Sequence, residues 1–135
     1  MKKIALFLVL MTTLLSCSID KPDSYTYYVL PIESYTMPTT FTVGATHEIK
    51  LKFQKPTACY LYGGIYYYSL DNTRTIGINA SVKDGESCSE ALPAVTEVSF
   101  NFVPATAGTY IFKFYKGKDD GGTDVFEDVE ITVTQ

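Results

Sequence analysis

The chain has 135 residues, with 11 Lys plus Arg, 15 Asp plus Glu and one His, and its formal net charge at pH 7 is −4. A single His excludes a metal site built from several His, and the acidic balance lacks the basic footprint of a nucleic-acid-binding protein. With 46% hydrophobic and 19% charged residues, the sequence is too apolar to be disordered throughout, and its length suits one domain.

The N-terminus has the pattern of a secretory signal. Lys2 and Lys3 precede a mostly apolar run at residues 4–15, and Ser16 and Cys17 follow it. This run is shorter than the roughly 20 residues that a bilayer core requires, but it fits the apolar region of a signal peptide. The alternative is a buried helix of the fold, although the run shows no amphipathic period.

The segment Leu14-Leu15-Ser16-Cys17 resembles the lipobox of bacterial lipoproteins. In that family the Cys thiol is thioether-linked to a diacylglyceryl group, the chain is cut before the Cys, and the new amino group is usually acylated, for example with palmitate. The resemblance implies a signal peptide at residues 1–16, lipidation of Cys17 and a polar tether over residues 17–24. The alternative is a plain secretory signal with Cys17 at a chance position.

The residues after Cys17 bear on the localisation. In enteric bacteria an Asp directly after the lipidated Cys retains a lipoprotein in the inner membrane, and Ser18 resembles the outer-membrane case instead. Asp20 and Asp23 loosely resemble the early acidic residues with which some Gram-negative groups export lipoproteins to the surface. We therefore expect a lipid-anchored protein of the bacterial cell envelope, with the outer membrane favoured and the periplasmic or surface face left open.

Residues 25–135 read as strands separated by turns. Apolar and polar residues alternate with a period of two in five segments: 48–54, 75–82, 97–102, 110–115 and 128–134. Residues 25–32 indicate a further strand, with Pro31 placing it at an edge or marking its end. Gly63-Gly64 fits either a hairpin turn or a bulge in one long strand. The pattern predicts an all-β domain, an antiparallel β-sandwich of seven to nine strands.

The segment 107–112, Ala-Gly-Thr-Tyr-Ile-Phe, resembles the E–F corner of immunoglobulin-like domains. In that family a Gly precedes the corner Tyr by two residues, and the Tyr hydroxyl bonds back to nearby backbone. The resemblance gives Tyr110 this role and implies an immunoglobulin-like sandwich. Thr106 replaces the usual Asp and Phe112 the usual Cys, and no core Trp is present, so an antibody-type domain is not implied.

Cys59 and Cys88 are the two thiols besides Cys17. In an exported protein two such Cys usually pair, which predicts a disulfide worth about 3.5 kcal/mol in the chain-entropy model. The alternative is two buried free thiols. A catalytic Cys is not expected, because His47 is the only His and no Cys-x-x-Cys motif occurs.

The remaining polar residues carry little catalytic signal. No nucleophile elbow, zinc-protease motif or phosphate-binding loop is present, so the sequence predicts neither an enzyme nor a cofactor. Asp119, Asp120 and Asp124 lie on a Gly-rich loop and are candidate ligands for a hard cation such as Ca²⁺, although EF-hand spacing is missing. The alternative is an acidic, solvated hairpin.

Tyrosine supplies the better functional signal. Five of them fall within nine residues: Tyr60, Tyr62, Tyr66, Tyr67 and Tyr68. Consecutive strand residues point to opposite faces, so Tyr66, Tyr67 and Tyr68 cannot all be buried. Exposed Tyr suits the recognition of a protein or a sugar, and the alternative is cross-strand pairing that only stabilises a sheet.

Two functions follow from these features. The first is a non-catalytic, lipid-anchored envelope module that binds a protein or glycan partner, which an accessible Tyr patch would favour. The second is a structural or assembly accessory of an envelope complex, which an exposed edge strand ready for strand addition would favour. Protease inhibition of the chagasin type is weaker, because the loop signatures of that family are missing.

Overall fold

The computed structural model describes residues 21–135, so the expected signal peptide and Cys17 lie outside the described residues. Residues 21–135 form nine strands and no helix, and therefore no helix that could cross a membrane. The strands are β1 (Tyr25–Leu30), β2 (Ser34–Thr36), β3 (Phe41–Thr42), β4 (His47–Phe53), β5 (Leu61–Leu70), β6 (Thr73–Lys83), β7 (Thr96–Phe102), β8 (Gly108–Lys118) and β9 (Asp124–Thr134). The all-β class and the number of strands are confirmed.

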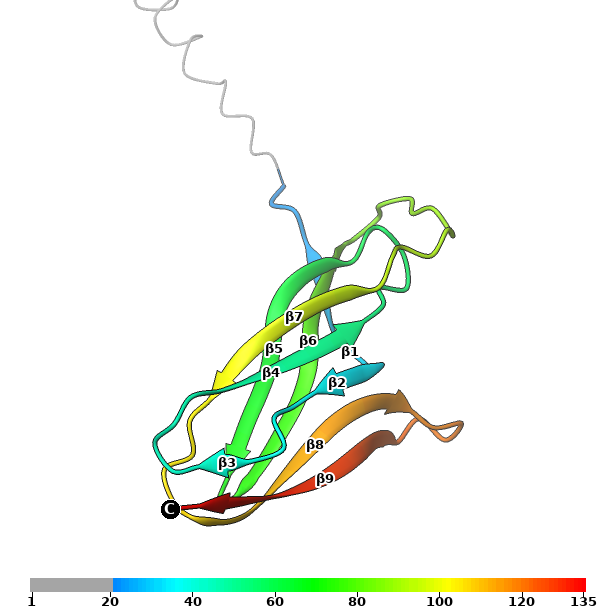
Figure 1. The fold of residues 1–135 in the computed structure, drawn as a ribbon. Coiled ribbons are helices and arrows are strands. Elements are labelled where there is room, and N and C mark those ends of the chain that lie inside the picture. The colour runs from blue at the N-terminus through cyan, green and yellow to red at the C-terminus, as the bar shows by residue number, and fades with distance from the viewer. Residues whose placement is uncertain (1–20) are drawn as a thin grey trace, which may run out of the picture.

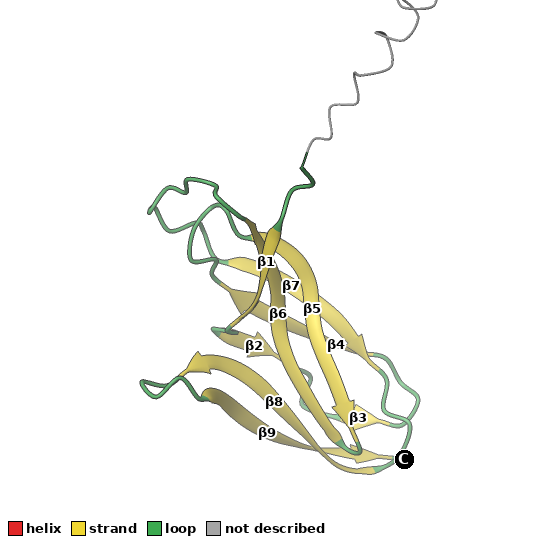
Figure 2. Ribbon diagram, turned by 180° about the vertical axis from the view of Figure 1, so that it is seen from behind, coloured by secondary structure: helices red, strands yellow, loops and turns green. Residues whose placement is uncertain are grey.

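The strands form two sheets that pack on one another (Figures 1 and 2). The smaller sheet has the order β2-β4-β7, and the larger has the order β1-β6-β8-β9-β3, with β5 pairing with β6. Alternating residues of both sheets meet in the core, where the Phe102 ring of the smaller sheet packs edge-on against Phe112 of the larger one, with 5.1 Å between ring centroids. This is the burial that the period-two alternation predicts.

Two strand pairs depart from the predicted antiparallel arrangement. β6 runs parallel to β8, and β3 runs parallel to β9. After β6 the chain crosses to the smaller sheet, forms β7 and returns as β8, so β8 enters the larger sheet in the same direction as β6. Parallel neighbours require such a crossover, and the prediction of a wholly antiparallel sandwich was wrong at these two pairs.

The Gly63-Gly64 segment is a bulge and not a hairpin turn. β5 continues through it, and its register against β6 shifts between Tyr62 and Gly64. Gly64 has a φ of 104°, a backbone conformation that favours glycine. β1 ends at Leu30, directly before Pro31, and lies at an edge of its sheet.

The corner before β8 has the bonding that the resemblance to immunoglobulin-like domains implies. Tyr110 is 2% exposed, and its hydroxyl donates to the Thr106 carbonyl oxygen at 3.2 Å. The Thr106 hydroxyl lies 3.1 Å from the same phenol oxygen. A buried phenol therefore satisfies its hydroxyl locally and fixes the entry into β8.

The predicted disulfide between Cys59 and Cys88 is confirmed, with the two Cα atoms 5.7 Å apart. Cys59 lies in the connection from β4 to β5, and Cys88 lies in the connection from β6 to β7. Both connections pass from one sheet to the other. The disulfide therefore joins the two crossovers at one end of the domain.

Candidate functional site

A fork in the larger sheet creates the main candidate site. One edge of β6 bonds to β1 along Ile78–Lys83 and to β8 along Thr73–Ile76, and Gly77 separates these two stretches. A Cβ atom on Gly77 would stand 2.6 Å from Val29 Cγ1, so a side chain here would displace Val29. Because Gly77 has no side chain, Val29 packs directly over it at the point where the neighbouring strands diverge.

The outer face of the sheet carries a groove of about 420 Å³ at this fork, which falls within the size range of small-molecule sites. We call it the aromatic groove. It is lined by Tyr27, Tyr28, Val29, Tyr66, Thr75, Tyr115, Lys118, Asp124 and Phe126. These residues come from β1, β5, β6, β8 and β9, so the first strand, the β5–β6 hairpin and the β8–β9 hairpin together build one surface.

The aromatic rings of the groove differ in accessibility. Tyr27 is 81% exposed and Tyr66 is 37% exposed, whereas Tyr115 is buried to 9%. The Phe126 ring tilts against Tyr115, with the ring centroids 5.7 Å apart. The buried Tyr115 ring and the half-buried Phe126 ring therefore support the groove, while the exposed rings of Tyr27 and Tyr66 offer flat apolar surface with polar hydroxyl tips.

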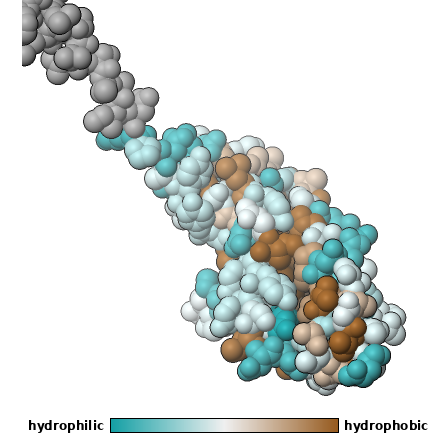
Figure 3. Space-filling model, turned by 90° about the vertical axis from the view of Figure 1, so that its left-hand side faces the viewer, coloured by the Kyte–Doolittle hydropathy of each residue, from teal (hydrophilic) through white to brown (hydrophobic). Residues whose placement is uncertain are grey.

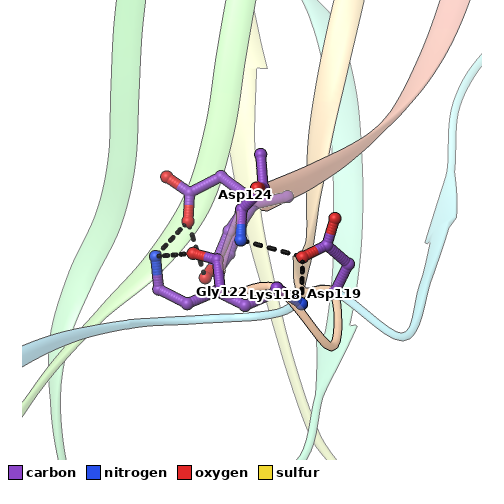
Figure 4. Close-up of polar contacts among 7 residues, drawn as sticks. Lys118, Asp119, Gly122 and Asp124 are labelled. Carbon is purple, nitrogen blue, oxygen red and sulfur yellow. Dashed lines mark hydrogen bonds and ion pairs between the residues drawn. The ribbon is translucent and has the colours of Figure 1, made fainter.

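The polar end of the groove is an ion pair. Lys118 Nζ lies 2.6 Å from Asp124 Oδ1 and also donates to the Gly122 carbonyl at 3.4 Å (Figure 4). The hydrogen bond and negative charge of Asp124 raise the pKa of the Lys118 ammonium group. Burial, followed by the charge of Asp124, raises the pKa of the Tyr115 phenol. At neutral pH the groove thus presents an ammonium group, a carboxylate and a protonated phenol beside its rings.

The Asp-rich loop does not gather its three carboxylates. Asp119 Oδ1 accepts the backbone N–H groups of Gly121 and Thr123, both at 2.9 Å, which closes the turn on itself (Figure 4). Asp124 belongs to the ion pair with Lys118. Among residues 21–135 no group of three or more His, Cys, Asp or Glu side chains is arranged to hold a metal ion, and Asp119, Asp120 and Asp124 form none.

The five clustered tyrosines do not form one patch. Their strand register places Tyr66 and Tyr68 on the outer face and Tyr67 on the inner face, because Tyr66 pairs with Gly77 and Tyr67 with Ile76. The Tyr62 ring stacks on Phe53 with centroids 5.8 Å apart, and the Tyr60 ring tilts against Tyr28 at 5.3 Å. Only Tyr66 of the five lines the aromatic groove.

Sequence reasoning missed most of the groove. Tyr115 and Phe126 were visible as aromatic residues on strands, but their pairing follows from the register of β8 against β9. The only feature of the sequence that pointed to Tyr27 was its place in a Tyr-rich first strand. No local pattern indicated that Lys118 and Asp124 would close one end of the groove.

The β5 edge is a second surface of interest. Within the described part of the chain β5 pairs only with β6, which leaves its other edge unpaired. Its ten residues, LYGGIYYYSL, include no charged side chain and no Pro. Charges, Pro and bulges are the usual means of blocking an edge, and the bulge at Gly63–Gly64 is the only one of these on β5, so the stretch at residues 65–70 is open to strand addition.

Figure 3 shows one side of the body, where brown apolar residues lie in separate groups among teal and pale ones.

No family model, curated protein or solved structure matches the chain. The aromatic groove can stack rings against a flat apolar or C–H face and exchange hydrogen bonds with hydroxyl or amide groups, which are the elements of non-covalent recognition.

Proposed function

We propose that the chain is a non-catalytic, lipid-anchored module of the bacterial cell envelope that binds a protein or glycan partner through the aromatic groove. The observation that carries the proposal is the groove itself, where accessible Tyr rings lie beside the Lys118–Asp124 ion pair on the outer face of the larger sheet. Tyr offers a large contact area at low entropic cost, which suits recognition. The lipobox-like segment at residues 14–17 and the Cys59–Cys88 disulfide support an exported, anchored protein.

We also propose that the fold is immunoglobulin-like. The two packed sheets and the Tyr110 corner support this relationship. The immunoglobulin fold surrounds the corner strand with antiparallel neighbours, whereas β8 has the parallel neighbour β6. The proposed domain is therefore a variant in which the β5–β6 hairpin takes the place beside the corner strand.

The groove is tested with two matched substitutions on one strand. Tyr66 and Tyr68 both point outward from β5, but only Tyr66 lines the groove. We expect Tyr66→Ala to weaken binding about tenfold, as for a central aromatic contact, and Tyr68→Ala to leave it unchanged. The measurement is binding of the full-length protein, in detergent, to immobilised bacterial glycans and to separated envelope proteins. Equal effects of the two variants would reject the groove as the binding site.

Lipid anchoring is tested at Cys17. Cys17→Ala removes the attachment point for the acyl chains. Two or three acyl chains hold a protein stably at a membrane, so we expect the variant without them to move from the membrane fraction to the soluble fraction. The Cys59→Ser/Cys88→Ser double variant is the control, since it removes the other thiols and should stay at the membrane. Membrane retention of Cys17→Ala would refute the anchor. Fractionation of inner and outer membranes tests the proposed outer-membrane location.

The second candidate function is that of an assembly accessory, and the uncharged, unpaired edge of β5 favours it. A partner strand would extend the larger sheet through main-chain hydrogen bonds. In the same binding experiment, Leu70→Lys at this edge separates the candidates. It should block capture of a partner that adds a strand and leave binding in the aromatic groove intact.

A further inference from the structure

A second cleft lies on the other side of β5, where the two sheets face one another at their open edge. It has a volume of about 470 Å³ and lies between β5 and β7. Its wall on the larger sheet includes Tyr67, Ser69 and Arg74, and its wall on the smaller sheet includes Phe100 and Val103. The Tyr67 and Phe100 rings meet edge-on across the cleft, with 5.7 Å between centroids.

Arg74 is the only arginine of the chain, and its guanidinium group is held in a fixed position. The guanidinium carbon lies 5.0 Å from the Tyr110 ring centroid and 5.9 Å from that of Phe102. Its Nη1 donates to the carbonyl oxygens of Asp71 and Thr73, at 2.6 and 2.9 Å. These bonds use the two N–H donors of Nη1, and a hydrogen bond with the Tyr67 phenol engages one more, so at least two of the five N–H donors of the group remain for a further partner.

Arg74 differs from the other cations of the sheets in having no carboxylate beside it. Three lysines each face an acidic residue directly across the ladder and pair with it: Lys52 with Glu97, Lys113 with Asp128 and Lys118 with Asp124. The residues across from Arg74 are Ser69 on β5 and Phe112 on β8. Within residues 21–135, no carboxylate oxygen lies within 4.0 Å of its guanidinium group.

A cation that is partly buried among aromatic rings has lost part of its hydration, and an anion in the cleft would compensate for that loss. Burial raises the pKa of the neighbouring Tyr67 phenol, and the charge of Arg74 and its hydrogen bond to the phenol oppose that rise. The phenol stays protonated at neutral pH and cannot act as the counter-ion. The planar guanidinium fork matches a carboxylate in shape and charge.

We propose that this cleft binds a carboxylate-bearing small molecule, with the carboxylate on Arg74 and an apolar body against Tyr67 and Phe100. The proposal does not depend on the aromatic groove, which lies on the opposite face of the larger sheet. The fixed guanidinium group supplies the charge-assisted hydrogen bonds, and the rings supply the apolar wall.

The single arginine makes the test direct, because its Nε–H group gives one side-chain signal in a ¹H–¹⁵N NMR spectrum. The full-length protein in detergent is titrated with sodium benzoate, with the neutral analogue benzamide, and with sodium phosphate at matched ionic strength. We expect benzoate to shift the Arg74 signal saturably with a Kd on the order of 1 mM, and benzamide to leave it unmoved. No saturable shift with benzoate, or tighter binding of phosphate, would overturn the proposal.

Two variants at Ser69 test the site without disturbing Arg74. Ser69→Glu places a carboxylate directly across from the guanidinium group, where it should occupy the fork and weaken benzoate binding at least about tenfold. Ser69→Gln has nearly the same shape without the charge and should bind benzoate like the unaltered protein. If Ser69→Glu binds benzoate as well as Ser69→Gln does, the carboxylate does not bind at Arg74. Thermal unfolding of both variants confirms that they are folded.

Discussion

At the scale of single residues, Tyr110 shows how a buried polar group is accommodated. Its ring packs edge-on against Phe102 with 5.5 Å between centroids, while its hydroxyl bonds to Thr106 four residues earlier. The apolar ring thus belongs to the core and the polar tip to the corner. The same ring faces the Arg74 guanidinium group, so one residue supports both the corner and the inner cleft.

Tyr110→Phe should lower the free energy of unfolding by about 1 kcal/mol, because it removes a part-buried hydrogen bond between the phenol and the Thr106 carbonyl. Urea denaturation of the full-length protein in detergent measures the change. Tyr68→Phe, which removes an exposed hydroxyl, should alter the free energy of unfolding by less than about 0.5 kcal/mol. If Tyr110→Phe is as stable as the unaltered protein, the Tyr110 hydroxyl does not stabilise the fold.

The tyrosine cluster shows how far local sequence reaches at this scale. The period of two correctly predicts that Tyr66, Tyr67 and Tyr68 cannot all be buried, and they indeed alternate between the faces of the sheet. It does not predict that Tyr66 and Tyr115 would line the same groove, because that depends on which strands become neighbours of β6. The sequence therefore predicted the kind of side chain that lines the candidate site, but of the five clustered tyrosines only Tyr66 lies in the groove.

At the scale of elements, the start of β1 is tied to the end of β6. The Asp84 carboxylate accepts hydrogen bonds from the hydroxyl groups of Ser24 and Thr26, the latter at 2.7 Å. The backbone N–H of Asp84 donates to the Ser24 carbonyl at 2.9 Å, and Lys83 pairs with Asp23 at 2.8 Å. These contacts fix the point where the chain from the N-terminus enters the folded body.

Asp84 makes this tie sensitive to acid. The hydrogen bonds from Ser24 and then Thr26 lower the pKa of the Asp84 carboxyl group in the folded protein. Its contribution to stability is therefore present above the pKa of the unfolded chain, about 4, and is lost as pH falls through the lower folded value. We expect Asp84→Asn to be less stable than the unaltered protein at pH 7 and the gap to shrink below about pH 4.

Urea denaturation between pH 7 and pH 2 measures this gap. Asp120→Asn is the matched control, because the Asp120 carboxylate accepts no hydrogen bond among the described residues. A gap for Asp84→Asn that is constant over the whole pH range would contradict the role of the carboxylate charge. The Asp84 carboxylate is exposed and solvent screens such contacts, so we expect the stability difference at pH 7 to be small.

The strands themselves were predictable where they are long and half-buried. β4, β7 and β9 alternate between core and solvent, and the five alternating segments all fall on strands. β2 and β3 have three and two residues, too few to show a period. The parallel pairing of β6 with β8 was not predictable, because alternation determines which face is buried and carries no information about the neighbouring strand.

At the scale of the whole molecule, the chain passes repeatedly between the two sheets, and the disulfide joins two of these passages. The connections from β4 to β5 and from β6 to β7 carry Cys59 and Cys88. Between them lies the β5–β6 hairpin, which contributes Tyr66 to the aromatic groove and Arg74 to the inner cleft. The covalent link therefore closes a loop around the hairpin on which both candidate sites depend.

Removing this link should destabilise the whole fold. The sequence separation of the two Cys is 29 residues, and closing a loop of that length restricts the unfolded chain by about 3.5 kcal/mol in the chain-entropy model. We expect Cys59→Ser/Cys88→Ser to lower the free energy of unfolding by about that amount, measured by urea denaturation. The reducing agent dithiothreitol should destabilise the unaltered protein equally and leave the double variant unchanged. If dithiothreitol changes neither protein, the two thiols do not form a stabilising disulfide.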